Sequence, residues 1–488
     1  MMTLWIFTEG DQQRGLGHIS RCHSYATAWE KLGGKVQWVI DGDSIAHLFI
    51  NGNNIVWKKW QFEKITISLN MDIAIIDSYT ASATQLKILS SLFKITAYID
   101  DTFRVKYPKG LVIHPTPDVT KIINNPSRWL MGTSWQPIRP DFIDIRKKNK
   151  KPKKTINNIL VMMGGTDILG ITNRIVNITK EMYPSATIHI ITNVQTACSL
   201  NCIYYSNLSA KQVAELMYQS DISICAAGQT IFELIASLLP SIIIKTAENQ
   251  SSQLERISSH NLFEIIDNWD NDNLIEKIRT SMSVLNDIQI RRTHALNMGK
   301  YPIPDGAQRL SHLLFYYSKI STTITYRELT LVPFIQLNKS EKITILSIRN
   351  RSKVRKEMHD TKRISISSHI KYIKSQEQDP CNVNYAVFYE NKIMGSTSLH
   401  RIDWIKKEAW LDIYRHPGDK WLGFGKKILQ AIEYIAFDIA NLEKLNLCVK
   451  VTNDVAFKLY KKSNFLERGS NEEFLEMELT KNRRLDEV

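Results

Sequence analysis

Short apolar runs separated by polar, glycine-containing turns recur through the first 145 residues. Residues 3–9 form one such run, and apolar side chains from Ile19 to Leu32 then recur at helical spacing until Gly33. This order predicts a buried strand, a loop and a helix. Further runs at residues 35–41, 72–77, 95–100 and 111–114 each end in polar or turn residues, as parallel strands do. The pattern predicts a first α/β domain over residues 1–145.

The same pattern restarts after a basic segment at residues 146–154. Strands are predicted at residues 159–163, 187–192 and 221–225, and the last of them leads into Gly228 and a helix. We therefore expect a second α/β domain over residues 155–318. Open parallel sheets bind ligands at the carboxyl ends of their strands, so two such domains predict a nucleotide-sized ligand.

The pattern changes near residue 327, where polar and apolar side chains begin to alternate. Residues 385–402 alternate around the turn Glu390, Asn391 and Lys392, which predicts an antiparallel hairpin. A strand at residues 409–414, a helix from Gly423, a strand at 445–451 and a helix at 453–462 follow. Residues 327–488 are therefore predicted to form a third, α+β domain.

Composition supports a globular chain with several cores. The 488 residues are 43% hydrophobic and 23% charged, which excludes a disordered or fibrous class. The net charge of +14 is concentrated, because the run RKKNKKPKK at residues 146–154 holds seven cations and no acid. We interpret this run as a solvated linker, with a nucleic-acid patch as the alternative, and expect no nucleic-acid partner.

Several classes of protein are disfavoured by what the sequence lacks. The most apolar region, residues 222–244, is interrupted by Glu233 and Pro240, so no membrane span is expected. The first residues carry acids and no basic leader, which argues against a secretory signal. Six cysteines without a CxxC motif are typical of free thiols in a reducing compartment. We expect a cytoplasmic protein without a metal site.

Two glycine-containing turns are candidates for anion binding. In the first domain, RGLGHISR at residues 14–21 places glycines before a helix N-terminus, and His18 can act there as a general base or acid. The alternative is a histidine that caps the helix. In the second domain, CAAGQTIFE at residues 225–233 places Gly228 in a strand-to-helix turn. Glu233 then either accepts hydrogen bonds from ribose hydroxyls or, as a carboxylate in the first turn, interacts favourably with the positive end of the helix dipole.

Seven short motifs occur in the order of a known family. They are GLGH at 15–18 with Arg21, DSY at 77–79, DD at 100–101, GGTD at 164–167, AAGQT at 226–230 with Glu233, NQ at 249–250 and DGAQR at 305–309. Over roughly residues 1–318 the chain resembles the UDP-sugar hydrolases of pseudaminic acid biosynthesis. That family resembles GT-B glycosyltransferases of the MurG kind, so the resemblance implies two Rossmann-like domains in a GT-B arrangement.

The resemblance also implies a reaction and a set of site residues. Water would attack the anomeric carbon without a metal, His18 would activate it, and Tyr79 and Asn249 would line the sugar site as further catalytic residues. The residues implied to bind the UDP-sugar are Gly15, Gly17, Arg21, Gly164, Gly165, Gly228, Gln229, Thr230, Glu233 and Gln250.

The third domain resembles the GNAT acetyltransferases. The resemblance runs from Gly395 through KWLGFGKKIL at residues 420–429 to NDVAFKLYKKSNF at residues 453–465. It implies acetyl-CoA as co-substrate, with Tyr460 protonating the departing thiolate; the alternative is a core tyrosine. IRN at 348–350 resembles the pseudaminic-pathway enzyme that acetylates a 4-amino group. The residues implied to bind acetyl-CoA are Lys420, Gly423, Phe424, Gly425, Lys426 and Asn453.

Together these resemblances predict a fusion of two enzymes that act on one UDP-linked amino sugar. One would acetylate the 4-amino group, and the other would release the sugar from UDP by hydrolysis. Two alternatives stay open: a GT-B glycosyltransferase fused to an acetyltransferase, and a sugar-nucleotide-binding scaffold whose acetyltransferase acts on protein amines. The expected partners are the UDP-linked amino sugar, acetyl-CoA and other enzymes of the same pathway.

Overall fold

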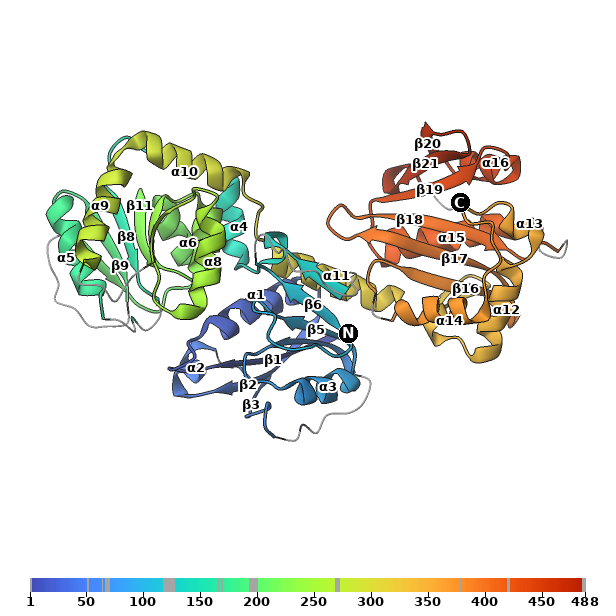
Figure 1. Ribbon diagram of the computed structural model, residues 1–488, viewed down its shortest axis with the longest axis horizontal. Helices are drawn as coiled ribbons and strands as arrows, with labels where there is room; N and C mark the ends of the chain where they lie inside the picture. The colour runs from blue at the N-terminus through green and yellow to red at the C-terminus, as the bar shows by residue number, and fades with distance from the viewer. Residues whose placement is uncertain are drawn as a thin grey trace. The chain divides into compact units, whose positions relative to one another are not determined.

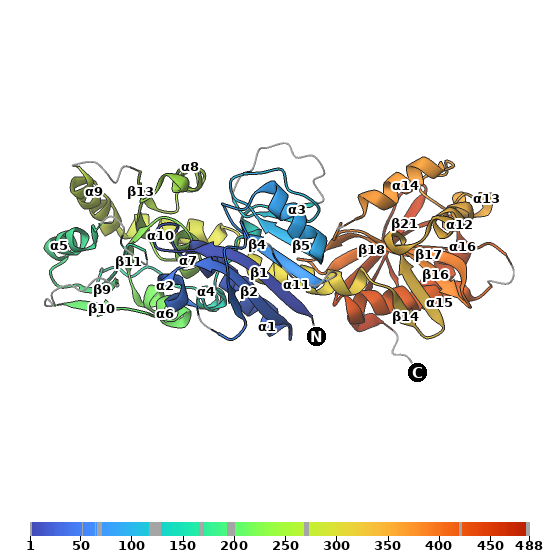
Figure 2. The ribbon, with the colours of Figure 1, turned by 90° about the horizontal axis from the view of Figure 1, so that it is seen from below.

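The computed structural model describes residues 2–50, 52–63, 65, 71–116, 128–164, 167, 170–192, 201–267, 273–377, 379–418 and 422–484 (Figures 1 and 2). By their internal contacts the residues fall into two units. The first comprises residues 1–124 and 129–311, and the second comprises residues 125–128 and 312–488. The first unit contains two parallel sheets, and the second contains one mixed sheet.

The first sheet has seven parallel strands in the order β3-β2-β1-β4-β5-β6-β7. Its bounds are β1 Thr3–Gly10, β2 Lys35–Gly42, β3 Ile55–Trp57, β4 Met71–Asp77, β5 Phe93–Ile99, β6 Leu111–His114 and β7 Trp129–Met131. The five predicted strands are confirmed to within two residues, because continuous apolar runs mark strands buried on both faces. The edge strands β3 and β7, three residues each, were not predicted.

Three helices connect the strands of this sheet: α1 Gly17–Lys31, α2 Ser44–Phe49 and α3 Ala83–Leu92. Helices α1 and α3 lie on opposite faces of the sheet (Figures 1 and 2). The chain moves outward from β1 to β2 in one direction and from β4 to β5 in the other. Because such crossovers are right-handed, the reversal puts their helices on opposite faces and opens a crevice between the ends of β1 and β4.

The second sheet repeats this topology with six parallel strands in the order β10-β9-β8-β11-β12-β13. Its strands are β8 Asn158–Met162, β9 Thr187–Ile191, β10 Cys202–Tyr205, β11 Ile222–Ala226, β12 Ser241–Ile244 and β13 Glu264–Ile266. The helices around it are α4 Pro140–Lys147, α5 Thr172–Met182, α6 Ala210–Gln219, α7 Thr230–Ser237, α8 Ser251–Ser258, α9 Leu274–Asn286 and α10 Ile288–Lys300. The direction of the strand order reverses between β8 and β11.

Helix α4 packs on the second sheet although its residues were predicted to end the first domain. Ile138, Phe142 and Ile145 are buried in one core with α6 and α7. Helical periodicity identifies the apolar face of such a helix but not the sheet that covers it. The core of the second sheet therefore begins before residue 155.

The basic run that follows α4 is not simply a solvated linker. Arg146 donates hydrogen bonds to the carbonyls of Ile235, Met298 and Gly299, at the ends of α7 and α10. Lys150 donates to two carbonyls at the end of α6, and burial lowers the pKa of Lys150 to about 7. The last carbonyls of a helix lack intrahelical partners and attract cations. The prediction of solvation is therefore wrong for these two side chains.

The sheet of the second unit has eight strands in the order β14-β15-β16-β17-β18-β19-β21-β20. They are β14 Ile324–Tyr326, β15 Leu329–Pro333, β16 Val383–Tyr389, β17 Lys392–Asp403, β18 Glu408–Arg415, β19 Lys444–Lys450, β20 Leu466–Ser470 and β21 Phe474–Thr480. The predicted hairpin is β16–β17, whose turn residues Glu390 and Asn391 both have positive φ. The helices are α12 Lys339–Arg349, α13 Ser352–Arg355, α14 Ile366–Ser375, α15 Phe424–Tyr434 and α16 Asp454–Lys462.

Strands β18 and β19 are the one parallel pair among the described strands of this sheet, and they pair only at their beginnings. The register joins residues 408–410 to residues 444–446. Beyond Trp410 the two strands separate, so the backbone of the second half of β18 lacks a partner on this side. Unpaired backbone groups at such an opening can bond a ligand.

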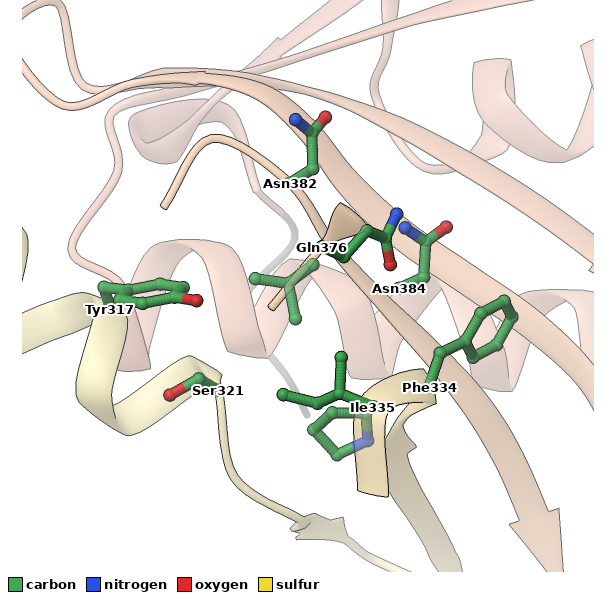
Figure 3. Close-up of a pocket in the computed structure, with 9 residues that line it drawn as sticks. Tyr317, Ser321, Phe334, Ile335, Gln376, Asn382 and Asn384 are labelled. Carbon is green, nitrogen blue, oxygen red and sulfur yellow. The ribbon is translucent and has the colours of Figure 1, made fainter. Parts of the chain in front are cut away.

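Helix α11, Gly306–Ile320, begins in the first unit and ends in the second. The Ser311 hydroxyl donates to the carbonyl of Tyr25 in α1, whereas the carbonyl of Ile320 accepts from the Tyr385 hydroxyl of β16. Figure 3 shows Tyr317 and Ser321 at a pocket that they share with Ile335, Gln376 and other residues of the second unit. The carboxyl-terminal half of α11 is therefore part of the third core.

We expect a fragment that begins at residue 327 to be less stable than one that begins at residue 306. The shorter fragment lacks Tyr317, Ile320 and Ile324, whose side chains are buried. Burial of each such side chain contributes about 1.5–3 kcal/mol, so the melting temperature should fall by at least about 10 °C. Thermal unfolding followed by circular dichroism measures this. Equal melting temperatures would contradict the assignment of α11 to the third core.

Candidate active sites

Carboxylates terminate four neighbouring strands of the first sheet. Glu9 lies near the end of β1, Asp41 near the end of β2, Asp77 at the end of β4 and Asp101 just after β5. Parallel strands end at one edge, so these side chains gather there. None of the four was predicted as a site residue. The signal was present in the sequence, because each of these apolar runs ends in an acidic residue.

Arg21 of α1 lies between two of these carboxylates. Its Nε and Nη2 donate to the two oxygens of Asp77 at 2.5 and 2.6 Å, and its Nη1 donates to Asp101 at 2.9 Å. Both Arg21 and Asp77 are buried. Burial raises the pKa of Asp77, but the Arg21 charge and then His18 outweigh burial and hold that pKa well below its ordinary value. This is a buried, charge-assisted network.

His18, the predicted base, joins this network through one ring nitrogen. Its Nδ1 lies 2.7 Å from Oδ1 of Asp77. Because a carboxylate only accepts hydrogen bonds, Nδ1 carries a proton, which places the lone pair of the neutral ring on Nε2. Among the residues that the structure describes, Nε2 has no partner. His18 is the second residue of α1 and does not cap that helix, so the capping alternative is not what the structure shows.

Tyr79 is placed beside His18 by two carboxylates. Its ring meets the imidazole edge-to-face with 4.4 Å between centroids, and its hydroxyl donates to Oδ1 of Asp101 at 2.6 Å. Its backbone N–H donates to Glu9 at 2.8 Å. Burial raises the pKa of Glu9, but hydrogen bonds from Thr80, Ser78, Gln61 and the Tyr79 backbone lower it below its ordinary value. Glu9 is therefore an ionised anchor of the loop that carries Tyr79.

The glycine turn before α1 is framed by charges. Gly15 has a φ of +75°, a conformation that favours glycine, and its N–H donates to the carbonyl of Asp11. Arg14 donates to the carboxylates of Asp11 and Asp41. Gly17 begins α1, whose N-terminus has no side-chain cap. Arg14 is a cation beside the turn that the sequence analysis did not single out.

The predicted residues of the second sheet gather at the turn between β11 and α7. Gly228 has a φ of +116°, and Thr230 begins α7 after Gln229, which does not cap the helix with its side chain. Glu233 is buried in the first turn and accepts two hydrogen bonds from Arg139, at 2.8 and 3.0 Å. The guanidinium of Arg139 thus donates to both carboxylate oxygens of Glu233, the same atoms that were expected to accept hydrogen bonds from a ribose.

Gln250 supports this turn from the neighbouring strand. Its Oε1 accepts from the backbone N–H groups of Thr246 and Ala247, and its Nε2 donates to the carbonyl of Ala227. It thus ties the turn after β12 to the turn after β11. Gly164 follows β8 with a φ of +88°. Gly165 and the side chain of Asn249 lie outside the described residues.

In the third domain, the predicted acetyl-CoA residues surround the start of α15. Gly423 precedes this helix with a φ of +83°, and no side chain caps the N-terminus that Phe424, Gly425 and Lys426 begin. A Cβ placed on Gly425 would lie 3.5 Å from Leu459 of α16, so the two helices meet closely here. Asn453 accepts from the N–H of Ala456 and caps α16. Lys420 lies outside the described residues.

Tyr460 lies on α16, buried beside Phe465 with 5.7 Å between ring centroids. Burial raises the pKa of Tyr460 and the charge of Asp412 adds to the rise, so the hydroxyl keeps its proton at neutral pH. Within the described part of the chain this hydroxyl has no hydrogen-bond partner. A buried, protonated and unpartnered hydroxyl is compatible both with a proton donor and with a core residue.

No group of three or more His, Cys, Asp or Glu side chains among the described residues is arranged to hold a metal ion. No described helix has both the length and the apolar character that a membrane span requires.

Asp77→Asn should destabilise the first unit strongly at neutral pH. It leaves Arg21 buried with one carboxylate, and breaking a buried pair costs about 3–5 kcal/mol. Because the pKa of Asp77 is lowered by folding, its contribution is present above about pH 4 and is lost as the pH falls. Urea unfolding should therefore show that the free energy of unfolding of the variant lies below that of the wild type at pH 7, and that this difference is smaller at pH 3.

Asp72→Asn, at the start of β4, is the matched control. Asp72 pairs with Lys94 at 3.3 Å on a partly exposed surface, so its loss should cost less than about 1 kcal/mol. If Asp77→Asn lowers the free energy of unfolding by no more than this control does, or by the same amount at both pH values, the role given to the buried pair is contradicted.

Comparison with known proteins begins with the carboxyl-terminal domain. The model of the acetyltransferase (GNAT) family matches residues 347–465. The acetyltransferase PseH of Campylobacter jejuni is 28% identical over 141 residues, which are 29% of this chain and 87% of that protein. The predicted GNAT domain is confirmed.

A second relative extends beyond this domain. It is the Helicobacter pylori protein named pseudaminic acid cytidylyltransferase and UDP-2,4-diacetamido-2,4,6-trideoxy-beta-L-altropyranose hydrolase, 27% identical over 256 residues. The match covers 51% of this chain and 45% of that protein, so the chain spans less than half the length of this relative. A match of 256 residues is too long for residues 327–488 alone, so it includes residues before 327.

Solved structures match the chain over about a third of its length. Campylobacter jejuni PseH in complex with acetyl coenzyme A is 24% identical and covers 31% of this chain and 99% of its own, with a TM-score of 0.27. Spermidine N-acetyltransferase from Vibrio cholerae, solved with CoA and spermine, is 21% identical and covers 32% and 98%, with a TM-score of 0.30. The chain is thus similar to pseudaminic acid pathway proteins, and its carboxyl-terminal region is a domain of the GNAT acetyltransferase family.

Proposed function

We propose that the chain carries out two consecutive reactions on one UDP-linked sugar. The GNAT domain acetylates the 4-amino group of a UDP-4-amino-4,6-dideoxy-N-acetyl-altrosamine with acetyl-CoA. The first unit then hydrolyses UDP-2,4-diacetamido-2,4,6-trideoxy-β-L-altropyranose to UDP and free sugar. The names of the two relatives, a hydrolase of this UDP-sugar and an acetyltransferase, support both reactions. The observation that carries the hydrolysis is His18, whose Nδ1 is held by Asp77 and whose Nε2 has no partner among the residues that the structure describes.

For hydrolysis, His18 takes a proton from water as the water attacks the anomeric carbon. Asp77 fixes the ring through Nδ1 and stabilises the imidazolium that forms. The buried network supports this, because two carboxylates, Asp77 and Asp101, surround the single charge of Arg21. The remaining negative charge favours a transient positive charge on His18. Tyr79, packed against the imidazole, lines the sugar site.

The UDP group binds at the second sheet in this proposal, in a GT-B arrangement of the two Rossmann-like domains. The N-terminus of α7, after Gly228, offers backbone N–H groups and the positive end of the helix dipole to the pyrophosphate. UDP leaves readily, so the reaction needs chiefly a positioned base and donors for the leaving phosphate. No metal takes part in this mechanism.

For acetyl transfer, the opening between β18 and β19 receives the pantetheine arm of acetyl-CoA, and the N-terminus of α15 binds its pyrophosphate. The unpaired backbone beyond Trp410 and the uncapped turn at Gly423 support this placement. The substrate amine attacks the thioester carbon, and Tyr460 gives its proton to the thiolate of coenzyme A. Acetylation comes first, because the hydrolysed sugar already carries two acetamido groups.

Mass spectrometry of a reaction with acetyl-CoA and the UDP-4-amino sugar tests both halves at once. The expected products are coenzyme A, UDP and the free diacetamido sugar. Release of UDP only when a sugar acceptor is supplied would instead support the glycosyltransferase alternative. Acetylation of a peptide amine but not of the sugar would support the scaffold alternative.

His18→Ala should abolish release of UDP while UDP binding stays within ten-fold of the wild type. Loss of a positioned base costs about 10² to 10⁴ in rate, whereas the proposed UDP contacts lie on the second sheet. Steady-state UDP release and calorimetric UDP binding measure the two effects. His23→Ala, an exposed position on the same helix, is the control and should keep full activity.

Hydrolysis in ¹⁸O-labelled water tests the site of attack. The wild type should place the label on C1 of the sugar, because His18 is proposed to direct water to the anomeric carbon. Label recovered in UDP would mean attack on phosphorus and would remove the proposed role of His18.

Tyr460→Phe should slow acetyl transfer by about 10² to 10⁴ and leave hydrolysis of the diacetamido substrate unchanged. The substitution keeps the ring against Phe465 and removes only the hydroxyl. Transfer is measured at saturating acetyl-CoA from the appearance of free thiol. Tyr434→Phe in α15 is the matched control. An unchanged rate for Tyr460→Phe would assign the tyrosine to the core.

A further inference from the structure

A His–Asp pair stands at the place where β18 and β19 separate. Asp412 lies two residues beyond Trp410, the last residue of β18 that pairs with β19. The register sets Asp412 opposite Ser398 and Trp410 opposite His400, so Asp412 and His400 share one face of the sheet. Nε2 of His400 lies 3.3 Å from Oδ2 of Asp412. The side chain of Asp412 is 59% exposed and can therefore meet a ligand.

Charged and polar groups of the surrounding elements lie within electrostatic range of this carboxylate. Partial desolvation raises the pKa of Asp412, but the interaction with His400 and the nearby His359 and Arg349 outweigh it and lower that pKa. Asp412 is thus a carboxylate at neutral pH. The groups that interact with it electrostatically are Arg349 of α12, His359, Tyr372 of α14, His400 of β17, Tyr414 of β18, Cys448 of β19 and Tyr460 of α16.

Tyr460 connects this cluster to the thioester chemistry. The charge of Asp412 contributes to the raised pKa of Tyr460, so the two side chains lie within electrostatic reach. Neither the Tyr460 hydroxyl nor Nη1 of Arg349 has a hydrogen-bond partner among the described residues, and Nη1 is buried. A proton donor and an anionic acceptor therefore lie within electrostatic range of each other. Acyl transfer to an amine requires both.

We infer that Asp412 and His400 form the acceptor-amine site of the third domain, where Asp412 binds the ammonium group of the substrate and the pair takes up its proton. This inference rests on the proposed acetyl transfer and names the chemistry that the acceptor must have. The acceptor is a primary amine, protonated in solution, on a small polar molecule. An alcohol or a neutral amide would leave the carboxylate unpaired and would bind weakly.

The protons balance along this route. The ammonium loses one proton to the Asp412–His400 pair, which passes it to solvent, and the nitrogen then forms a bond to the acetyl carbon. As the carbon–sulfur bond breaks, Tyr460 gives its proton to sulfur and the nitrogen loses its second proton to the pair. This second proton returns to Tyr460 by way of water. The products are the acetamide and coenzyme A.

The experiment measures acetyl transfer to the UDP-4-amino sugar by the full-length chain with Asp412→Asn and with His400→Gln. Asp412→Asn should raise the KM for the amine at least ten-fold and lower kcat/KM about 10²-fold, while calorimetric binding of acetyl-CoA stays unchanged. Glu476→Gln is the matched control, because Glu476 is an exposed carboxylate on β21 opposite Cys448. It should keep wild-type kinetics.

The pH profile separates a proton acceptor from a structural residue. Both variants should recover activity as the pH rises, because the amine then loses its proton to solvent without help; a merely misfolded site would not recover. Wild-type kinetics in both variants, or a loss that persists at high pH, would overturn the inference alone. If the wild type fails to acetylate the UDP-4-amino sugar, the proposed function fails and the inference fails with it.

Discussion

The buried guanidinium of Arg21 is the constraint on which the carboxyl edge of the first sheet depends. A buried charge needs partners of opposite sign, and Asp77 and Asp101 supply them from the ends of neighbouring strands. Each carboxylate has a further lone pair, and these hold His18 and Tyr79. Two of the three residues predicted for the hydrolytic reaction, His18 and Tyr79, therefore share one cation as their support. The resemblance implied that Arg21 binds the UDP-sugar, but each of its three nitrogens donates to a carboxylate, which favours a positioning role.

Most strands were predictable from the sequence because their apolar runs are buried on both faces. The strands β3, β7, β10, β12 and β13 were not predicted, since runs of three or four residues give no clear periodicity, and β14, β15, β20 and β21 of the third sheet were also missed. The position of α4 was not predicted, because a helical pattern shows which face of the helix is apolar but not which sheet that face packs against. The basic run was misread because charge alone predicts solvent, whereas Arg146 and Lys150 meet the carbonyl ends of three helices.

In the candidate sites, too, features that depend on neighbouring residues could be predicted, whereas contacts between residues far apart in the sequence could not. Glycine turns and His18 can be read locally, since a turn with positive φ or a helix start leaves its mark within a few residues. The partnership of His18 with Asp77 spans 59 positions and depends on which strand lies beside β1. Acidic strand ends marked the candidates, but only the strand order selects the one that meets the imidazole. The same holds for His400 and Asp412, which the antiparallel register brings together.

The charge at the carboxyl edge of the first sheet also bears on which part of the substrate each sheet of this unit binds. Two cations, Arg14 and Arg21, stand there against five carboxylates: Glu9, Asp11, Asp41, Asp77 and Asp101. Such an edge repels a diphosphate, so the glycine turn before α1 is a poor phosphate site despite its open helix N-terminus. Negative charge does favour the positive charge that develops at an anomeric carbon as its leaving group departs. This charge distribution supports the proposal that the sugar binds at the first sheet and the diphosphate at the N-terminus of α7.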